Sequence, residues 1–329
     1  MNDERSLPLA GPGYRVEVRS ADGTRLNVES YGPDDAPTVV LAHGWTCSLV
    51  FWAKQVEALI ADGVRVVAYD QRGHGASGLP GPAGPTPEAL ADDLSAVLAS
   101  PLVRGHRVIL AGHSMGAMTL IAFGARHPQE LQDRVSAALL ASTGMNELVV
   151  RSRIVPLPLP LAKLARPVIT WLMALSPAGH QPNRWQRALT RYSALSRSAS
   201  EADVVFCDAL IGACPPATRA AFARMLSRLD LDEHVPRFDV PAIVVAGTRD
   251  RLTPIWHARR LAGSLPQLLE FIPVEGSGHM TPVQSADDVN AALRRLVREY
   301  LQPLRQSPQE MHATPPDGSI NVSEIPETS

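Results

Sequence analysis

Two patterns of hydrophobic and polar positions follow one another along this chain. Residues 14–19 and 25–31 alternate apolar and polar side chains, which is typical of an antiparallel hairpin with one face in water. From residue 38 onward the apolar runs are continuous, at 38–42, 64–69, 108–112, 135–141, 242–247 and 268–273. Continuous runs of this length indicate strands buried on both faces of a parallel sheet. The pattern therefore predicts an eight-stranded, mostly parallel sheet with an antiparallel edge.

Apolar residues at helical spacing fill most of the segments between the buried strands. We expect helices at 51–61, 87–99, 115–126, about 255–265 and about 286–301. Thr86 and Pro87 supply an N-cap and a first-turn proline for the second of these helices. Strands that alternate with helices predict an α/β fold with helices on both faces of the sheet.

One long interruption separates the sixth and seventh strands. Residues 146–236 contain no strand-like run, so we expect a helical cap inserted between two parts of the core, residues 1–145 and 237–303. Within the interruption, residues 148–177 are unusually apolar. They predict either helices that pack on the sheet and on each other, or a lid over an apolar substrate tunnel, with transient contact to a membrane surface. Residues 304–329 lack periodicity and are expected to be a disordered tail.

Composition narrows the class of protein. The 329 residues carry 31 basic and 33 acidic side chains, a formal net charge of -2, which gives no electrostatic reason to expect a nucleic-acid partner. Cys47, Cys207 and Cys214 lie at no metal-ligand spacing, so we expect no metal, no cofactor and no disulfide. No apolar stretch reaches the length of about 18 residues typical of a transmembrane helix, and the polar start shows no secretory signal. These features predict a cytoplasmic protein.

One serine lies where a predicted strand meets a predicted helix. Ser114 stands in Gly112-His113-Ser114-Met115-Gly116, between the apolar run that begins at Val108 and the helix that begins at Met115. A sharp turn of this kind tolerates no bulky side chain two residues before or after the serine, and both positions are glycine. The turn exposes the hydroxyl, and the backbone N–H of Met115 at the helix N-terminus can stabilise an oxyanion. Ser114 is therefore the candidate nucleophile.

A serine nucleophile needs a histidine base and a carboxylate that orients it. His279 follows the last predicted strand in Glu275-Gly276-Ser277-Gly278-His279, which we interpret as a flexible glycine loop. Asp250 follows the seventh strand in Gly247-Thr248-Arg249-Asp250; it is the candidate orienting carboxylate, or alternatively an acid that precedes the helix at Thr253. Both residues follow strands at the carboxyl edge of the sheet, where ligands of open parallel sheets bind.

Five motifs together resemble those of the α/β-hydrolase fold family, in particular its capped serine esterases, lipases and lactonase-like members. They are His43-Gly44-Trp45, Asp70-Gln71-Arg72-Gly73-His74-Gly75-Ala76-Ser77, the Ser114 turn, Gly247-Thr248-Arg249-Asp250 and Gly278-His279. The resemblance covers about residues 14–303. It implies that Ser114 is the nucleophile, His279 the base, Asp250 its orienting group, and the backbone N–H groups of Trp45 and Met115 the oxyanion hole. It also implies that His43 is a structural hydrogen-bonding residue and that the turn at 70–77 forms the floor of the site, with Arg72 held locally.

The resemblance implies cleavage of a carboxylic ester, with an apolar acyl or lactone substrate, through an acyl-enzyme on Ser114. Haloalkane dehalogenases and epoxide hydrolases of this fold use an aspartate at the same position, so they are disfavoured. Four alternatives stay open: carbon–carbon bond hydrolysis, thioester hydrolysis, perhydrolysis of the haloperoxidase type, and a non-catalytic ligand-binding protein. The expected partner is a small apolar ester, and the sequence predicts no particular oligomeric state.

Overall fold

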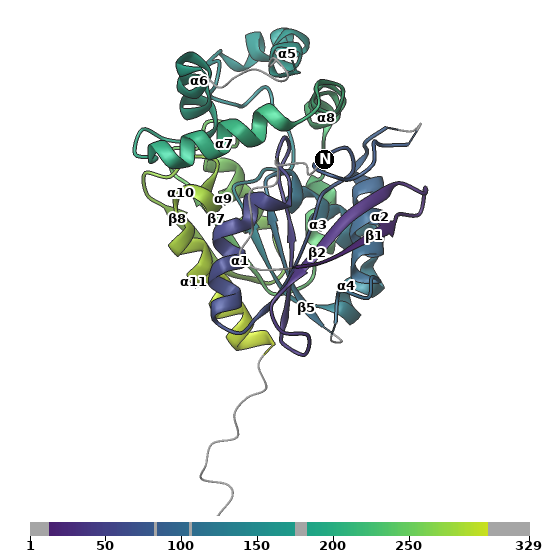
Figure 1. Ribbon diagram of the computed structural model, residues 1–329. Helices are drawn as coiled ribbons and strands as arrows, with labels where there is room; N and C mark the ends of the chain where they lie inside the picture. Colours follow the sequence, from purple (N-terminus) through teal and green to yellow (C-terminus); the bar gives the residue numbers. More distant parts are fainter. Residues whose placement is uncertain (1–12, 82–83, 105–106, 175–182, 302–329) are drawn as a thin grey trace, which may run out of the picture.

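One eight-stranded sheet forms the centre of the computed structural model, which describes residues 13–81, 84–104, 107–174 and 183–301 (Figure 1). The strands lie in the order β1-β2-β4-β3-β5-β6-β7-β8. Their bounds are β1 Tyr14–Arg19, β2 Arg25–Tyr31, β3 Thr38–Ala42, β4 Arg65–Tyr69, β5 Val108–His113, β6 Val135–Ala141, β7 Ala242–Gly247 and β8 Leu268–Val274. β2 runs antiparallel to both β1 and β4, and the remaining pairs are parallel. The predicted α/β fold is confirmed.

Burial explains the two sequence patterns with two exceptions. The apolar run at 268–273 was expected to be buried on both faces, but in β8 only Val274 is buried, because β8 is the edge strand and pairs only with β7. Every residue of β3, β4, β5, β6 and β7 is buried, as their continuous apolar runs predict. β2, by contrast, does not have the expected wet face. Asn27 is buried because its side chain donates to Asp70 at 2.9 Å, and Ser30 is buried because its hydroxyl accepts from Arg65 at 3.0 Å. Polar residues in this strand therefore mark buried hydrogen bonds rather than contact with water.

Helices cover both faces of the sheet, and each face has its own apolar core. One core includes residues of η1 (Leu49–Trp52), α1 (Ala53–Ala61) and α11 (Ala286–Tyr300). The other includes residues of α2 (Pro87–Leu98), α3 (Met115–Arg126), α4 (Pro128–Arg134) and α9 (Trp256–Ser264). Figure 1 shows α1 and α11 on the opposite side of the strands from α2 and α3. The sequence did not predict the short α4 or α10 (Thr281–Gln284), which adjoin longer helices.

The segment between β6 and β7 is helical. It contains α5 (Leu159–Ala174), α6 (Arg184–Ala194), α7 (Glu201–Ala213), α8 (Pro216–Arg228) and η2 (Asp232–Arg237). α5 packs on α8, and α6 packs on α7. The two ends of the segment meet in an antiparallel bridge between Asn146 and Asp230. Figure 1 shows α5 and α6 at the end of the molecule farthest from α11's C-terminus.

Two further expectations concern the membrane and the tail. Within the described ranges, no helix combines the length and the apolar character needed to span a bilayer. The predicted disordered tail at 304–329 lies outside the described residues. The three cysteines are buried and carry free thiols.

Candidate active site

Ser114 occupies a strained turn between β5 and α3. Its backbone has φ 51° and ψ -115°, a conformation that is costly for a residue with a side chain. A Cβ at Gly112 would lie 2.5 Å from the nitrogen of Ala117, and a Cβ at Gly116 would lie 2.0 Å from the carbonyl oxygen of Ala42. Both glycines are therefore required by the close packing of α3 on the sheet, as the sequence predicts. The turn directs Ser114 into a cavity.

Asp250 and His279 form a buried pair at the carboxyl edge of the sheet. The Nδ1–H of His279 donates to Asp250 Oδ2 at 2.8 Å, and the side chains are almost fully buried. Asp250 Oδ2 also accepts from the hydroxyl of Thr253 at 2.8 Å, while Oδ1 accepts the backbone N–H groups of Leu252 and Thr253 at 2.8 and 2.9 Å. Asp250 thus contacts His279 and also accepts backbone N–H groups ahead of α9, and its orienting role stays a prediction.

The loop that carries His279 is packed rather than free, contrary to the flexible loop that its glycines suggested. The backbone N–H groups of His279 and Met280 both donate to the carbonyl oxygen of Ala194 at 3.0 Å. A Cβ at Gly278 would lie 2.4 Å from the backbone of Leu195. Glycine is thus needed here because the end of α6 passes directly over the loop.

Ser114 and His279 line the same cavity from different elements. Because Nδ1 of His279 is engaged with Asp250, Nε2 is the nitrogen that remains for a proton from Ser114. The Ser114 hydroxyl makes no hydrogen bond to another described residue. Such contacts are often long in unliganded enzymes and shorten when substrate binds. The arrangement supports nucleophile and base roles for the two residues, and these roles stay predictions.

The two predicted oxyanion donors also border this region. Met115 is the first residue of α3, and Trp45 lines the cavity in the loop after β3. Neither backbone N–H donates to another group within the described residues, so both are available to an oxyanion. The loop is fixed at Thr46, which has φ 64° and whose N–H donates to Nε2 of His74 at 3.2 Å.

Three buried histidines support these loops from below. Nδ1–H of His43 donates to the carbonyl oxygen of Gly44 at 2.7 Å, and its Nε2 accepts the N–H of Gln71 at 3.0 Å. Burial lowers the pKa of His43 to about 4 and that of His74 to about 3, so both rings are neutral hydrogen-bonding groups. His43 therefore has the structural contacts expected of it.

His113 is a supporting residue that the sequence analysis missed. Its Nε2–H donates to the carbonyl oxygen of His279 at 3.0 Å, and its ring stacks on Phe51 at 4.5 Å. Burial lowers the pKa of His113 well below its usual value. The residue before Ser114 thus holds the backbone of His279, across 166 positions of sequence.

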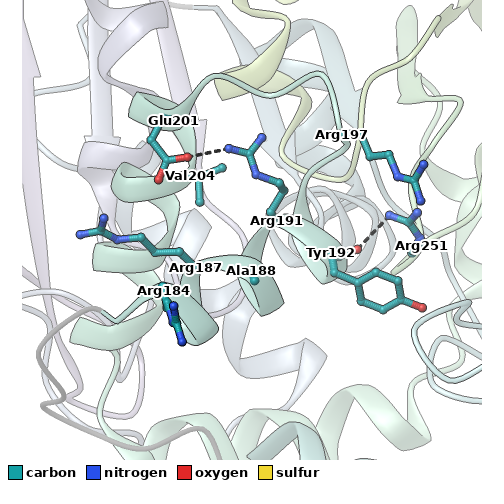
Figure 2. A pocket seen from close by; sticks show the side chains of 9 residues that line it. All are labelled: Arg184, Arg187, Ala188, Arg191, Tyr192, Arg197, Glu201, Val204 and Arg251. Carbon is teal, nitrogen blue, oxygen red and sulfur yellow. Dashed lines mark hydrogen bonds and ion pairs between the residues drawn. The ribbon is translucent and has the colours of Figure 1, made fainter.

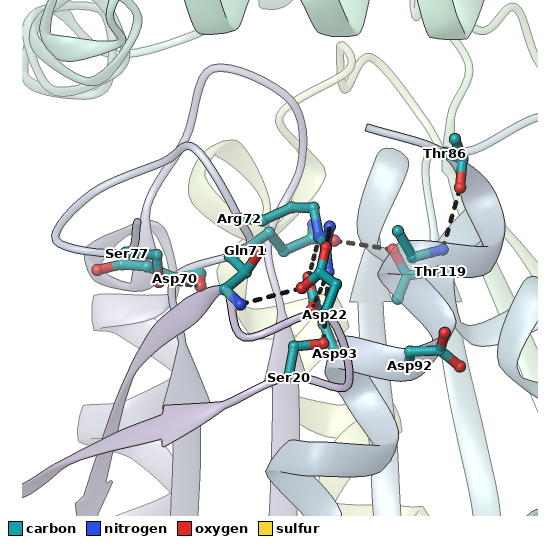
Figure 3. A network of polar contacts seen from close by, with 12 residues as sticks. Ser20, Asp22, Asp70, Gln71, Arg72, Ser77, Thr86, Asp92, Asp93 and Thr119 are labelled. Carbon is teal, nitrogen blue, oxygen red and sulfur yellow. Dashed lines mark hydrogen bonds and ion pairs between the residues drawn. The ribbon is translucent and has the colours of Figure 1, made fainter. Parts of the chain in front are cut away.

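The turn at 70–77 is held by a network of charges (Figure 3). Arg72 donates to both carboxylate oxygens of Asp93 at 2.7 Å and to Asp22 at 2.8 Å. These carboxylates raise the pKa of Arg72, and the Arg72 guanidinium lowers the pKa of Asp22 to about 2. None of the residues 70–77 lines the cavity. The local restraint predicted for Arg72 is present, beneath the site rather than in it.

The cavity above Ser114 has a volume of about 420 Å³ and is mainly apolar. Its walls include Met118 of α3, Ile169 and Leu172 of α5, Leu189 of α6 and Leu226 of α8. No aspartate or glutamate is among the described residues that line it. In the same described ranges, no group of three or more His, Cys, Asp and Glu side chains is placed to hold a metal ion.

One buried cation reaches the cavity wall. Arg219 of α8 is 1% exposed, and its guanidinium donates to the carbonyl oxygens of Ile211 at 2.6 Å and Cys214 at 3.0 Å. No local sequence signal identified it, because its partners lie on the preceding helix and turn.

Comparisons with known proteins identify the family of this chain. The family model described as serine aminopeptidase, S33, matches residues 33–283. A bifunctional esterase/perhydrolase DCH of Acinetobacter calcoaceticus is 26% identical over 85% of this chain and 99% of its own length. A non-heme chloroperoxidase of Streptomyces lividans is 29% identical over 80% and 92% of the two chains. The structure of a thermophilic esterase from Thermogutta terrifontis superposes with a TM-score of 0.68, at 26% identity over 87% of this chain and 98% of that one.

Proposed function

Because this chain belongs to the serine aminopeptidase S33 family and is a serine hydrolase of the α/β-hydrolase fold, we propose that it cleaves carboxylic esters with an apolar acyl group or a lactone ring. The observation that carries the proposal is the placement of Ser114 and His279 on one apolar cavity, with Asp250 bonded to the far nitrogen of the imidazole at 2.8 Å. This is the arrangement that activates a serine hydroxyl for acyl transfer.

The proposed reaction has two halves. Ser114 Oγ attacks the ester carbonyl carbon, its proton passes to Nε2 of His279, and the N–H groups of Trp45 and Met115 stabilise the oxyanion. The imidazolium, stabilised by Asp250, then gives that proton to the departing alcohol, which leaves the acyl group on Ser114. In the second half His279 takes a proton from a water molecule, which attacks the acyl-enzyme carbonyl; the C–Oγ bond then breaks, the imidazolium gives its proton to Ser114 Oγ, and the carboxylic acid is released.

The lining of the cavity favours an apolar ester over a peptide. An aminopeptidase binds a free α-ammonium group, which needs a carboxylate when it is taken out of water. The described wall of this cavity contains no aspartate or glutamate. Apolar groups are stabilised there instead, since each buried methylene contributes roughly 0.8 kcal/mol to binding.

We further propose that residues 146–236 act as a cap that forms the substrate wall. Side chains from α5, α6 and α8 line the cavity together with Ser114. The bridge between Asn146 and Asp230 brings the two ends of the segment together. Part of the apolar stretch packs within the segment, as Ala162 does at 2% exposure, and part of it is exposed to solvent, as Leu164 is.

The compartment we propose is the cytoplasm, which keeps thiols reduced. Cys47, Cys207 and Cys214 are free and buried, and burial raises the pKa of Cys207 to about 12 and that of Cys214 to about 11. These cysteines are packing residues without a reactive thiolate.

Perhydrolysis is a second candidate, favoured by the printed activities of two relatives, an esterase/perhydrolase and a non-heme chloroperoxidase. It requires only that hydrogen peroxide replace water in the second half-reaction. Attack of the peroxide oxygen on the acyl-enzyme then releases a peracid in place of the acid.

A fluorophosphonate probe tests the nucleophile directly. The wild-type protein should be labelled at micromolar probe and Ser114→Ala should not. Ser193→Ala is the matched control, because Ser193 lines the same cavity but its hydroxyl donates to the carbonyl oxygen of Leu189 at 2.8 Å. Equal labelling of Ser114→Ala and the wild type would refute the assignment, and no labelling of either would indicate a non-catalytic binding protein.

A substrate panel separates the reactions that share this triad. It comprises p-nitrophenyl esters from acetyl to octanoyl, a lactone, a thioester and a diketone, each with and without hydrogen peroxide. Preferential turnover of medium-chain esters or the lactone supports the proposal. Preferential turnover of the thioester or the diketone, or faster peracid formation than hydrolysis, would replace it with the corresponding alternative.

A further inference from the structure

Exposed apolar side chains are concentrated on one part of the molecule. Ten of the fourteen large apolar residues that are exposed in the described structure lie between residues 155 and 192. α5 contributes Leu161, Leu164, Val168, Trp171 and Leu172, with Leu164 81% exposed. Leu161, Leu164, Val168 and Trp171 share one side of the helix, whereas Leu172 lies three residues from the buried Ile169 and, like it, lines the cavity above Ser114. A stripe of this size is unusual on a soluble monomer and indicates an interaction surface.

α6 has three faces with different chemistry. Its solvent face carries Trp185 at 71% and Tyr192 at 43% exposure, and Leu189, which is 61% exposed, lies between this face and the cavity above Ser114 that it also lines. One flank, which includes Gln186 and Ser193, lines the catalytic cavity. The other flank carries arginines. A partner that covers the solvent face of α6 would therefore contact the arginines on one flank and the wall of the catalytic cavity on the other.

The arginines line a second cavity of about 420 Å³ (Figure 2). Its five cationic side chains are Arg184, Arg187 and Arg191 of α6, Arg197 of the following turn, and Arg251 of the loop after β7. The single carboxylate in the lining, Glu201, is bound to Arg191 at 2.7 Å. Arg184, Arg187 and Arg197 form no ion pair with a carboxylate in the described part of the chain. The positive charge of this cavity favours an anionic partner.

We propose that the outer faces of α5 and α6 dock on an anionic phospholipid bilayer. Leu161, Leu164 and Val168 enter the headgroup–acyl boundary, where Trp185 and Tyr192 have both an apolar and a polar neighbour. The arginines bind lipid phosphates, and anionic lipids strengthen the contact further. The catalytic cavity then borders the bilayer along α6, so apolar substrates dissolved in the membrane enter without crossing water.

A second copy of this chain fits the surface less well. A self-complementary dimer would bury the same arginine clusters together, and the only carboxylate among the residues lining the described cavity is already paired. An anionic bilayer supplies the missing counter-charges over its whole area.

Vesicle cosedimentation of the full chain tests the proposal without any substrate. Binding to phosphatidylcholine vesicles with about a third phosphatidylglycerol should exceed binding to pure phosphatidylcholine by about tenfold at low salt, and should weaken as salt rises. Leu164→Ser and Trp185→Ser should each weaken binding by about tenfold. Leu79→Ser is the matched control, because Leu79 is 67% exposed and lies outside α5 and α6. Its binding should equal that of the wild type.

The contribution of the arginines to vesicle binding has its own control variant. Arg184→Glu with Arg197→Glu should abolish the preference for anionic vesicles, whereas Arg15→Glu with Arg298→Glu, which changes net charge equally at side chains 60% and 66% exposed elsewhere, should not. Equal effects of the two double variants would overturn the arginine site. Absence of vesicle binding, or a solution dimer that Leu164→Ser dissociates, would overturn the proposal. Because no turnover is measured, these outcomes are independent of the proposed ester chemistry.

Discussion

Acid should destabilise this protein strongly, because several histidines are buried in their neutral form. Burial lowers the pKa of His43 and His257 to about 4 and that of His74 to about 3, from 6.5 for an exposed imidazole. At pH 5 the protonated form of each side chain outnumbers the neutral form by about thirtyfold in the unfolded chain. In the folded protein the same side chain stays mostly neutral. The unfolded state then binds more protons. Stability is therefore fully present above pH 6.5 and falls as the pH drops from 6.5 toward 4.

The magnitude is about 2 kcal/mol per histidine between pH 7.5 and pH 5, or about 6 kcal/mol for the three together. A typical domain has about 5 to 15 kcal/mol in total, and the raised pKa values of Asp70 and Asp93 offset part of the histidine sum, so the protein should be clearly less stable at pH 5 than at pH 7.5. His74 is the most informative position because its Nε2 accepts the N–H of Thr46 at 3.2 Å, next to the proposed oxyanion donor Trp45. Its protonation would remove that acceptor.

Urea unfolding of His74→Gln, followed by tryptophan fluorescence and circular dichroism, isolates one histidine. The variant should be less stable than the wild type at pH 7.5, and the difference should shrink by about 2 kcal/mol at pH 5. Phe222→Leu is the control, because Phe222 packs on the His74 ring at 4.8 Å and does not titrate. Its difference from the wild type should be equal at both pH values. The comparison also cancels Asp70, whose pKa burial raises and which acts in the opposite direction. A pH-independent difference for His74→Gln would refute the reasoning.

Four further predictions concern single substitutions, one of them with a control variant. Ser114→Ala should lower turnover by on the order of 10⁴-fold with an unchanged melting temperature, because the hydroxyl faces a cavity; substantial residual activity would contradict the role of Ser114. Asp250→Asn should lower kcat by on the order of 10³ to 10⁴-fold with little change in KM, since the carboxylate orients the base; a change confined to KM would argue against it. Leu172→Asp should raise KM for octanoyl esters more than for acetyl esters, whereas Trp171→Asp, 59% exposed and outside the cavity wall, should affect both equally. Asp93→Ala should cost about 3 to 5 kcal/mol in urea unfolding because it leaves a buried guanidinium without its main partner, and a loss below about 1 kcal/mol would show that Asp22 suffices.

The features that the sequence predicted are those encoded locally. The buried strands follow from continuous apolar runs, and the turn at Ser114 follows from two glycines whose missing Cβ atoms would collide with Ala117 and Ala42. The fold and the proximity of Asp250 and His279 could be predicted from the order of the strands and from the rule that loops at one edge of a parallel sheet lie together.

The missed features depend on partners that are distant in sequence. The Asn27 side chain is buried by Asp70, 43 positions away, so its strand resembled one with a wet face. His113 supports His279 through a contact that no local motif encodes. The glycines before His279 suggested flexibility, whereas they permit close packing beneath α6. In each case the residue type indicated a constraint, and only the tertiary structure identified what imposed it.

The carbonyl oxygen of Ala194 has a consequence for protein engineering. The segment between β6 and β7 looks exchangeable, since its two ends meet at Asn146 and Asp230. Yet the last residue of α6 accepts the backbone N–H groups of both His279 and Met280. A chimera that grafts this segment from a relative would swap the proposed substrate wall and also remove an acceptor from the histidine loop. Successful grafts must therefore restore a carbonyl at that point, and a transplant chosen by cavity shape alone would be expected to lose turnover even with a perfect fit to its new substrate.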